Sequence, residues 1–219
     1  WGFIDTNGKI VIKPAFYDAN DFSDGLARVQ KDGYYGFINS KGEIIIDFQF
    51  FEINDFFEGK SCVLKNGKYG YINKDGLIVI EPEFEDAGSF SNGLAPIKKD
   101  GKWGFIDKEG NIAITPQFDY AFSFSEGMAL VVKDKMYGYI NIKGEIVINP
   151  QYTKGGDFHD GIAAVENNGV FSFINSKGFL MTEHFFEDAG SFSDGLAPIK
   201  KDGKWGFIDK KGVMVINFK

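Results

Sequence analysis

The chain has 219 residues, of which 43% are hydrophobic and 25% are charged, and its formal net charge is -7. The hydrophobic share is large enough for a core. Nucleic-acid binding requires a basic stripe that replaces phosphate counterions, and the sequence shows no such stripe. Nucleic-acid binding is therefore not expected. Membrane insertion is not expected either, because no apolar run reaches the roughly 18 residues of a membrane span. The single cysteine, Cys62, excludes an internal disulfide and a cysteine-built zinc site.

A period of 34 residues organises the whole chain. Segments 85–110 and 187–212 are nearly identical and lie 102 residues apart, which is three periods. Units of this kind stack on their neighbours and do not fold singly. We therefore predict one continuous array over residues 1–219, in which the last repeat is partial. Each repeat starts at an aromatic residue, with no insertion between copies: Trp1, Tyr35, Tyr69, Trp103, Tyr137, Phe171 and Trp205.

The fourth repeat shows the expected order of elements. Residues 103–107 are aromatic and β-branched and favour a strand. Residues 107–110 have the D-x-x-G pattern of a hairpin turn that ends in a left-handed glycine. Residues 112–114 form a second expected strand, and a long loop follows Pro116. A third strand over 128–133 leads through a tight turn into the next repeat, so each repeat reads as three strands and one loop.

These units predict an all-β protein of tandem three-stranded meanders. Runs such as Ile10-Val11-Ile12 lack polar alternation, so both faces of these strands are expected to be covered. The favoured arrangement is an open superhelical array. In a closed ring one terminus usually supplies a strand that the other lacks, whereas here the hairpin at residues 1–13 precedes six complete three-stranded units. A closed six-bladed propeller-like ring is the alternative. The ring would have a radius of gyration of about 17 Å, and the open array would exceed about 20 Å.

The pattern K-W-G-F-I-D-x-x-G-x-I-V-I-x-P-x-F, followed by F-S-x-G-L-A, resembles the bacterial WG-repeat family. The resemblance covers the whole chain, and the repeats at Trp103 and Trp205 match most closely. Tyr or Phe replaces the Trp in four copies, and Ser172 replaces the Gly in the sixth. The resemblance implies β-rich repeats with a binding role and supplies no active-site motif.

A non-enzymatic scaffold that presents its long loops to a protein or glycan partner is the predicted function. The loops carry variable polar residues, whereas the strands repeat. The candidate ligand-binding residues are Tyr17, Asn20, Tyr120, Thr153, Lys154 and His159. A structural spacer that projects other domains is the alternative, because recent duplication lengthens an array without creating a site. Open strand edges at the Trp1 hairpin and at Val213 to Phe218 would also permit end-to-end self-association.

No catalytic, cofactor-binding or metal-binding residue is predicted. His159 and His184 stand 25 residues apart and lack a third ligand at a repeated position. The recurring Trp slot is expected to be a core position, because Tyr and Phe also occupy it. The acidic residue before the Gly of F-S-x-G is expected on a solubilising loop surface, with an acidic rim for cations as the alternative. The sixth repeat breaks its own pattern between Ser172 and His184, through either drift or local specialisation.

Overall fold

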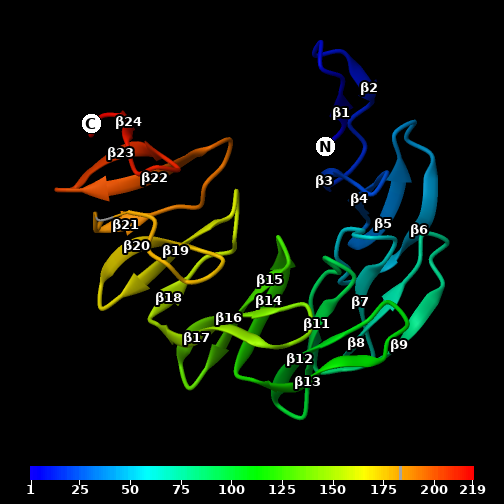
Figure 1. The fold of residues 1–219 in the computed structure, drawn as a ribbon. Coiled ribbons are helices and arrows are strands. Elements are labelled where there is room, and N and C mark those ends of the chain that lie inside the picture. Colours follow the sequence, from blue (N-terminus) through cyan, green and yellow to red (C-terminus); the bar gives the residue numbers. More distant parts are fainter. Residues whose placement is uncertain (183) are drawn as a thin grey trace. The chain divides into compact units, whose positions relative to one another are not determined.

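The computed structural model describes residues 1–182 and 184–219, and in these residues the regular secondary structure is β-strand. The described part contains no helix long and apolar enough to cross a membrane. The chain divides into two compact units, one of residues 1–100 and 106–111, the other of residues 101–105 and 112–219. Each unit is built from consecutive antiparallel meanders, whose strands Figure 1 labels in chain order.

The first unit begins with a two-stranded hairpin and continues with a four-stranded and a three-stranded sheet. The hairpin strands are β1 (Phe3–Ile4) and β2 (Ile10–Ile12). The four-stranded sheet contains β3 (Asp18–Ser23), β4 (Leu26–Lys31), β5 (Tyr34–Asn39) and β6 (Ile44–Phe50). The three-stranded sheet contains β7 (Ser61–Lys65), β8 (Lys68–Ile72) and β9 (Ile78–Phe84). The strands β10 (Asp86–Ala87) and β11 (Ala95–Lys99) follow.

The division between the units falls within β12 (Lys102–Ile106), and β13 (Ile112–Phe118) belongs to the second unit. That unit continues with three more meanders. They are β14 (Tyr120–Ser125), β15 (Met128–Lys133), β16 (Met136–Asn141) and β17 (Ile146–Tyr152), then β18 (Lys154–Gly155), β19 (Ile162–Asn167) and β20 (Val170–Asn175), and finally β21 (Asp188–Ala189), β22 (Leu196–Lys201), β23 (Lys204–Asp209) and β24 (Met214–Ile216).

The all-β repeat architecture is therefore confirmed, and the strands extend further than the sequence indicated. The segment after Pro116 does not run as a free loop. It continues β13 to Phe118, and β14 then pairs with β15 as a further strand of the sheet. The long segments are thus largely tied into the sheets by backbone hydrogen bonds, which limits the surface that they can present as loops.

Turn chemistry explains the short connections. Asp32 and Gly33 both have positive φ, 51° and 85°, as a two-residue type I′ hairpin requires. In the D-x-x-G turns the first side chain organises the loop. The carboxylate of Asp107 accepts the backbone N–H groups of Glu109 and Asn111 at 3.0 and 2.8 Å. The hydrogen bond from the Asn111 side chain is the main cause that holds the pKa of Asp107 below its usual value, and the backbone hydrogen bonds add to it.

The second-position glycine, present in every repeat except the sixth, allows a close backbone approach. A Cβ atom at Gly104 would lie 2.4 Å from the carbonyl oxygen of Ile114, and one at Gly138 would lie 2.7 Å from that of Ile148. These distances are too short for any side chain, so the glycine lets the outermost strand cross directly over the aromatic strand.

The core of each unit is made by the invariant Ile and Phe positions. Ile38, Ile72 and Ile106 are at most 1% exposed, and Phe56 and Phe90 are equally buried. Aromatic pairs link the strands, for example Phe105 and Phe124 with ring centroids 4.9 Å apart. The invariant positions therefore fill the interior, except in the first repeat, where Ile4 and Phe22 are 66% and 39% exposed.

The expectation that the Ile-Val-Ile strands are covered on both faces is wrong. Only the third residue is buried: Ile46 is 3% exposed, whereas Ile44 and Ile45 are 53% and 44% exposed. The reason is that this strand is the last of its sheet, with a solvent-facing edge. The prediction that the Trp position of the repeat belongs to the core holds for one of the three tryptophans. Trp103 is 5% exposed, but Trp1 and Trp205 are 66% and 44% exposed.

Candidate functional site

The six predicted ligand-binding residues do not form one site. Tyr17 and Asn20 belong to the first unit, and the other four belong to the second. Tyr17 projects freely and is 83% exposed. Asn20 is occupied, because its amide donates to the carboxylate of Asp55 at 3.0 Å. Tyr120 is half-exposed and stacks against Trp103, with ring centroids 4.7 Å apart.

Thr153 and Lys154 are engaged with the buried carboxylate of Glu166. The Lys154 ammonium lies 2.5 Å from Glu166 Oε2, and the Thr153 hydroxyl donates to Glu166 Oε1 at 3.0 Å. The Lys154 ammonium is the main cause that holds the pKa of Glu166 below its usual value. Lys154 and Glu166 face each other across β18 and β19, and the equivalent pair in the last full repeat is Asp188 and Lys200, with the charges exchanged. These side chains stabilise a strand pair.

The acidic residue before the Gly of F-S-x-G accepts a hydrogen bond from the next repeat. The backbone N–H of Gly161 donates to Glu126 Oε2 at 2.8 Å, from 35 residues further along the chain. The N–H of Gly93 donates to Glu58 at 3.0 Å in the same way, and Lys108 lies 3.0 Å from that carboxylate. These acidic residues are exposed, as expected of a solubilising surface, and they also make contacts between repeats. The carboxylates fasten one repeat to the next.

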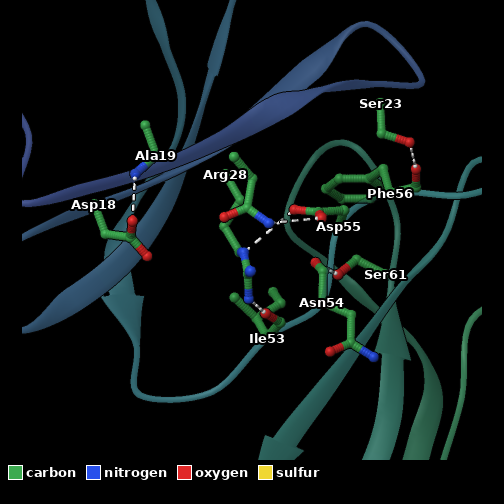
Figure 2. Close-up of polar contacts among 10 residues, drawn as sticks. Asp18, Ala19, Ser23, Arg28, Ile53, Asn54, Asp55, Phe56 and Ser61 are labelled. Carbon is green, nitrogen blue, oxygen red and sulfur yellow. Dashed lines mark hydrogen bonds and ion pairs between the residues drawn. The ribbon is translucent and has the colours of Figure 1, made fainter. Parts of the chain in front are cut away.

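Arg28 makes a further connection between repeats, which Figure 2 shows. Its Nη1 donates to the carbonyl of Ile53 at 2.5 Å, and its Nε lies 3.2 Å from Asp55 Oδ1. The guanidinium also lies over the ring of Tyr35, 4.9 Å from the centroid. The side chains of Arg28 and Asp55 are both largely buried, and the charge of each compensates the charge of the other. Neither side chain is therefore free to bind a ligand.

The equivalent of Asp55 three repeats later has lost its partner. Asp157 occupies the same repeat position, and Leu130 stands where Arg28 would be. Burial raises the pKa of Asp157, and nearby His159 opposes this only in part. His159 is exposed, and its backbone N–H donates to the carbonyl of Ile162 at 3.0 Å. Among the described residues, no group of three or more metal-ligating side chains gathers around either histidine.

A groove recurs between consecutive repeats, and it is the best candidate site. Its first wall is the end of the outermost strand, for example Gln49 and Phe50. Its second wall is the hairpin of the next repeat, at Lys65 and Asn66, and Ile78 forms the floor. This groove has a volume of about 340 Å³. The same repeat positions line a groove of about 690 Å³ between the fifth and sixth repeats and one of about 380 Å³ after the sixth.

The groove between the fifth and sixth repeats is the largest of the three. We call it the sixth-repeat groove. Its polar walls are Gln151, Asn167 and Asn168, and its apolar surface consists of Tyr152, Val170, Leu180 and Phe185, with Ser172 between them. Leu180 and Phe185 are both 57% exposed. An open apolar hollow with a few convergent polar groups is the usual form of a binding site.

Ser172 replaces the repeat glycine in the lining of this groove. The other repeats have glycine here, which lets the outermost strand cross close above. In the fifth repeat this strand pairs at Tyr139 and Ile148, between the pairs at its two ends. The sixth repeat keeps only the end contacts, as isolated bridges at Leu180 and Phe186 among the described residues. The departure between Ser172 and His184 thus changes the shape of a recurring groove, a consequence that the sequence pattern did not indicate.

The comparisons with solved structures show the fold. A structure described as the eukaryotic initiation factor has a TM-score of 0.64 and 9% identity, over 97% of this chain and 69% of that chain. The dihydro-heme d1 dehydrogenase NirN has a TM-score of 0.58 and 14% identity, over 97% of this chain and 59% of its own. BamB from Moraxella catarrhalis has a TM-score of 0.56 and 11% identity, over 89% and 70%. The chain thus spans about three fifths to seven tenths of these proteins.

Sequence comparison assigns the family. No curated protein matches the chain. The family model described as WG containing repeat matches every part of it, at residues 1–35, 35–69, 69–103, 103–137, 137–171, 171–205 and 205–219. The aromatic residue that opens each match is the start of the 34-residue period, and the glycine beside it permits the close strand crossing. The chain therefore belongs to the WG-repeat family.

Proposed function

We propose that this protein is a non-enzymatic protein-interaction scaffold whose inter-repeat grooves bind extended segments of a partner. The observation that carries the proposal is the recurrence of one groove at equivalent repeat positions, at three junctions. The two grooves of the second unit share Phe185, and adjoining grooves of this kind suit a linear partner better than a compact one.

Two features support binding through grooves rather than loops. The polar loop residues Asn20, Thr153 and Lys154 are occupied by contacts within the chain. The grooves are lined in part by exposed apolar residues, since Phe51 is 75% exposed and Leu180 is 57% exposed. Exposed apolar side chains grouped around a hollow mark interaction sites more often than scattered ones.

Selection from a phage-displayed library of random linear peptides tests the proposal. We expect the intact chain to enrich related peptides, and the combined substitutions Phe51→Ser, Leu180→Ser and Phe185→Ser to abolish their binding. Ile142→Ser is the matched control, because Ile142 is 53% exposed but lies in a D-x-x-G-type turn that lines none of the three grooves. Absence of enrichment, or enriched peptides that bind the combined variant as well as the intact chain, would overturn the proposal.

A structural spacer is the second candidate, and the contacts between repeats favour it. The hydrogen bonds from Gly93 to Glu58 and from Gly161 to Glu126 fasten successive repeats in the same way. A repeated fastening can extend an array to any length. Counting repeats in related full-length proteins separates the two functions, since freely varying numbers support a spacer and a fixed number supports a binding surface.

A further inference from the structure

The hairpin that lines the sixth-repeat groove differs in charge from its counterparts. In the other repeats this turn carries charged residues, as in Lys99 to Lys102 and in Lys201 to Lys204, both of sequence K-D-G-K. In the sixth-repeat groove the turn is Asn167-Asn168-Gly169-Val170, which has no charge. The chain as a whole has a net charge of -7, so the uncharged turn at the sixth-repeat groove differs from the charged surface elsewhere.

Three carboxamide groups in this groove have no partner in the part of the chain that the structure describes. Gln151, Asn167 and Asn168 line the groove, and their side chains take part in no hydrogen bond with a described residue. The amide of Asn20, in contrast, is bound to Asp55. Each carboxamide offers two donor hydrogens and one acceptor oxygen, the same groups that a peptide backbone presents in complementary form.

The remaining surface of the groove is apolar. Val170 is 41% exposed, and Leu180 and Phe185 are more exposed still. The outermost strand of the sixth repeat, which would pair fully with β20, contacts it only through isolated bridges among the described residues. The groove therefore combines amides that have no partner among the described residues with an apolar wall.

We propose that the sixth-repeat groove binds an extended, uncharged peptide segment that carries an apolar side chain. The apolar side chain packs on Val170, Leu180 and Phe185. The amides of Gln151, Asn167 and Asn168 hydrogen-bond the peptide backbone, which satisfies both sets of polar groups. This inference rests on the proposed function and specifies the ligand class of one groove.

A neutral glycan is the competing ligand, and the wall chemistry disfavours it. Sugar recognition uses aromatic faces together with many polar groups, whereas two of the four apolar residues here, Val170 and Leu180, are aliphatic. A charged peptide is disfavoured because no residue of the lining carries the opposite charge. An unpaired charge in an apolar site costs several kcal/mol.

The test restores the charged turn. The triple substitution Asn167→Lys, Asn168→Asp and Val170→Lys installs the K-D-G-K sequence that occurs naturally at Lys99 to Lys102. Circular dichroism and thermal melting check that the variant folds. Calorimetric titration with library-selected uncharged peptides is expected to show binding weakened by about tenfold or more, because the new charges meet an apolar ligand. The control Lys143→Gln alters the charge of a turn that lines none of the three grooves and should leave the affinity unchanged.

The outcomes separate this inference from the proposed function. If the selected peptides are lost on Phe51→Ser but not in the triple variant, grooves bind peptides but this assignment is wrong. If no peptide binds the intact chain, both proposals fail. A panel of neutral oligosaccharides is titrated in parallel. Binding of an oligosaccharide that the triple variant abolishes, with no peptide competing for it, would replace the peptide assignment by a glycan one.

Discussion

The backbone N–H of Gly195 donates to the carboxylate of Asp160, 35 residues earlier in the chain, at 3.0 Å. The same carboxylate lies 2.9 Å from the ammonium of Lys210. One acidic side chain thus contacts two later repeats at once, and Asp24 and Glu58 make equivalent contacts in the first unit. Hydrogen bonds and ion pairs therefore join consecutive repeats, in addition to their apolar cores.

Asp160→Ala is expected to lower the melting temperature by a few degrees, because it removes both contacts. Lys210 is the main cause that holds the pKa of Asp160 below its usual value. A lowered folded-state pKa contributes stability above the unfolded pKa, and this contribution is lost as the pH falls through the folded value. Thermal melts should therefore separate the variant from the parent at pH 7 and bring them together near pH 2. A gap of the same size at both pH values would contradict an ionic origin.

Asp157→Asn should raise the stability at neutral pH, whereas Asp55→Asn should lower it. Burial raises the pKa of Asp157, so its ionisation on raising the pH costs stability. The asparagine removes that cost, and its advantage should vanish below the unfolded pKa of about 3.9. Asp55 instead compensates the guanidinium of Arg28 at 3.2 Å. Urea titrations of both variants at pH 7 and at pH 3 check this, and a loss of stability in Asp157→Asn at pH 7 would contradict it.

Phe124→Ala should destabilise the fold far more than Tyr120→Ala. Phe124 is 2% exposed, and truncation of a buried Phe typically costs about 3–5 kcal/mol. Tyr120 is 43% exposed, but its ring contacts Trp103 and Phe122. We therefore expect about 0.5–1.5 kcal/mol for its loss, the usual worth of aromatic pairs, which is above the 0.5 kcal/mol limit of an ordinary surface position. Equal losses in denaturant titrations would show that the burial assignment is wrong.

Gly138→Ala and Ser172→Gly should act in opposite directions on the outermost strands. A Cβ atom at Gly138 would lie 2.6 Å from the backbone nitrogen of Pro150, so alanine should cost about 1–3 kcal/mol. Ser172→Gly removes the side chain that keeps the strand away in the sixth repeat. It should increase hydrogen-exchange protection at Met181 and Phe186 and narrow the sixth-repeat groove. Unchanged exchange at both amides would show that Ser172 does not set the groove width.

The thiol of Cys62 should react only after unfolding. Cys62 is 2% exposed, and its pKa is raised to about 12, mainly by burial. Both effects suppress the thiolate that reacts with alkylating reagents. Native protein should therefore resist a chromogenic disulfide reagent at pH 8, and protein in concentrated guanidinium should react at once. Rapid reaction of the native protein would contradict the burial of β7.

The period of 34 residues is by itself sufficient to predict the core, the turns and the family of this protein. The invariant Ile and Phe positions predicted the core, because only burial makes the same apolar residue recur at one phase of every repeat. The D-x-x-G and Asp-Gly pairs predicted the turns, because positive φ is a local requirement that a few residue types meet. The family followed from the same pattern, in which the glycine of the Trp-Gly pair, for example Gly104, is the clearest feature.

Which polar residues are available to a ligand depends instead on tertiary contacts. The sequence made Asn20, Thr153 and Lys154 look free, yet each is held by a residue from another strand. Such contacts depend on how sheets stack, since a carboxylate at Asp160 meets an amide 35 residues later only when two repeats have the right offset. The exchange of charge between Lys154–Glu166 and Asp188–Lys200 was a sequence signal for one of these pairs. The volume of the sixth-repeat groove had no such signal, because it depends on how neighbouring strands pack.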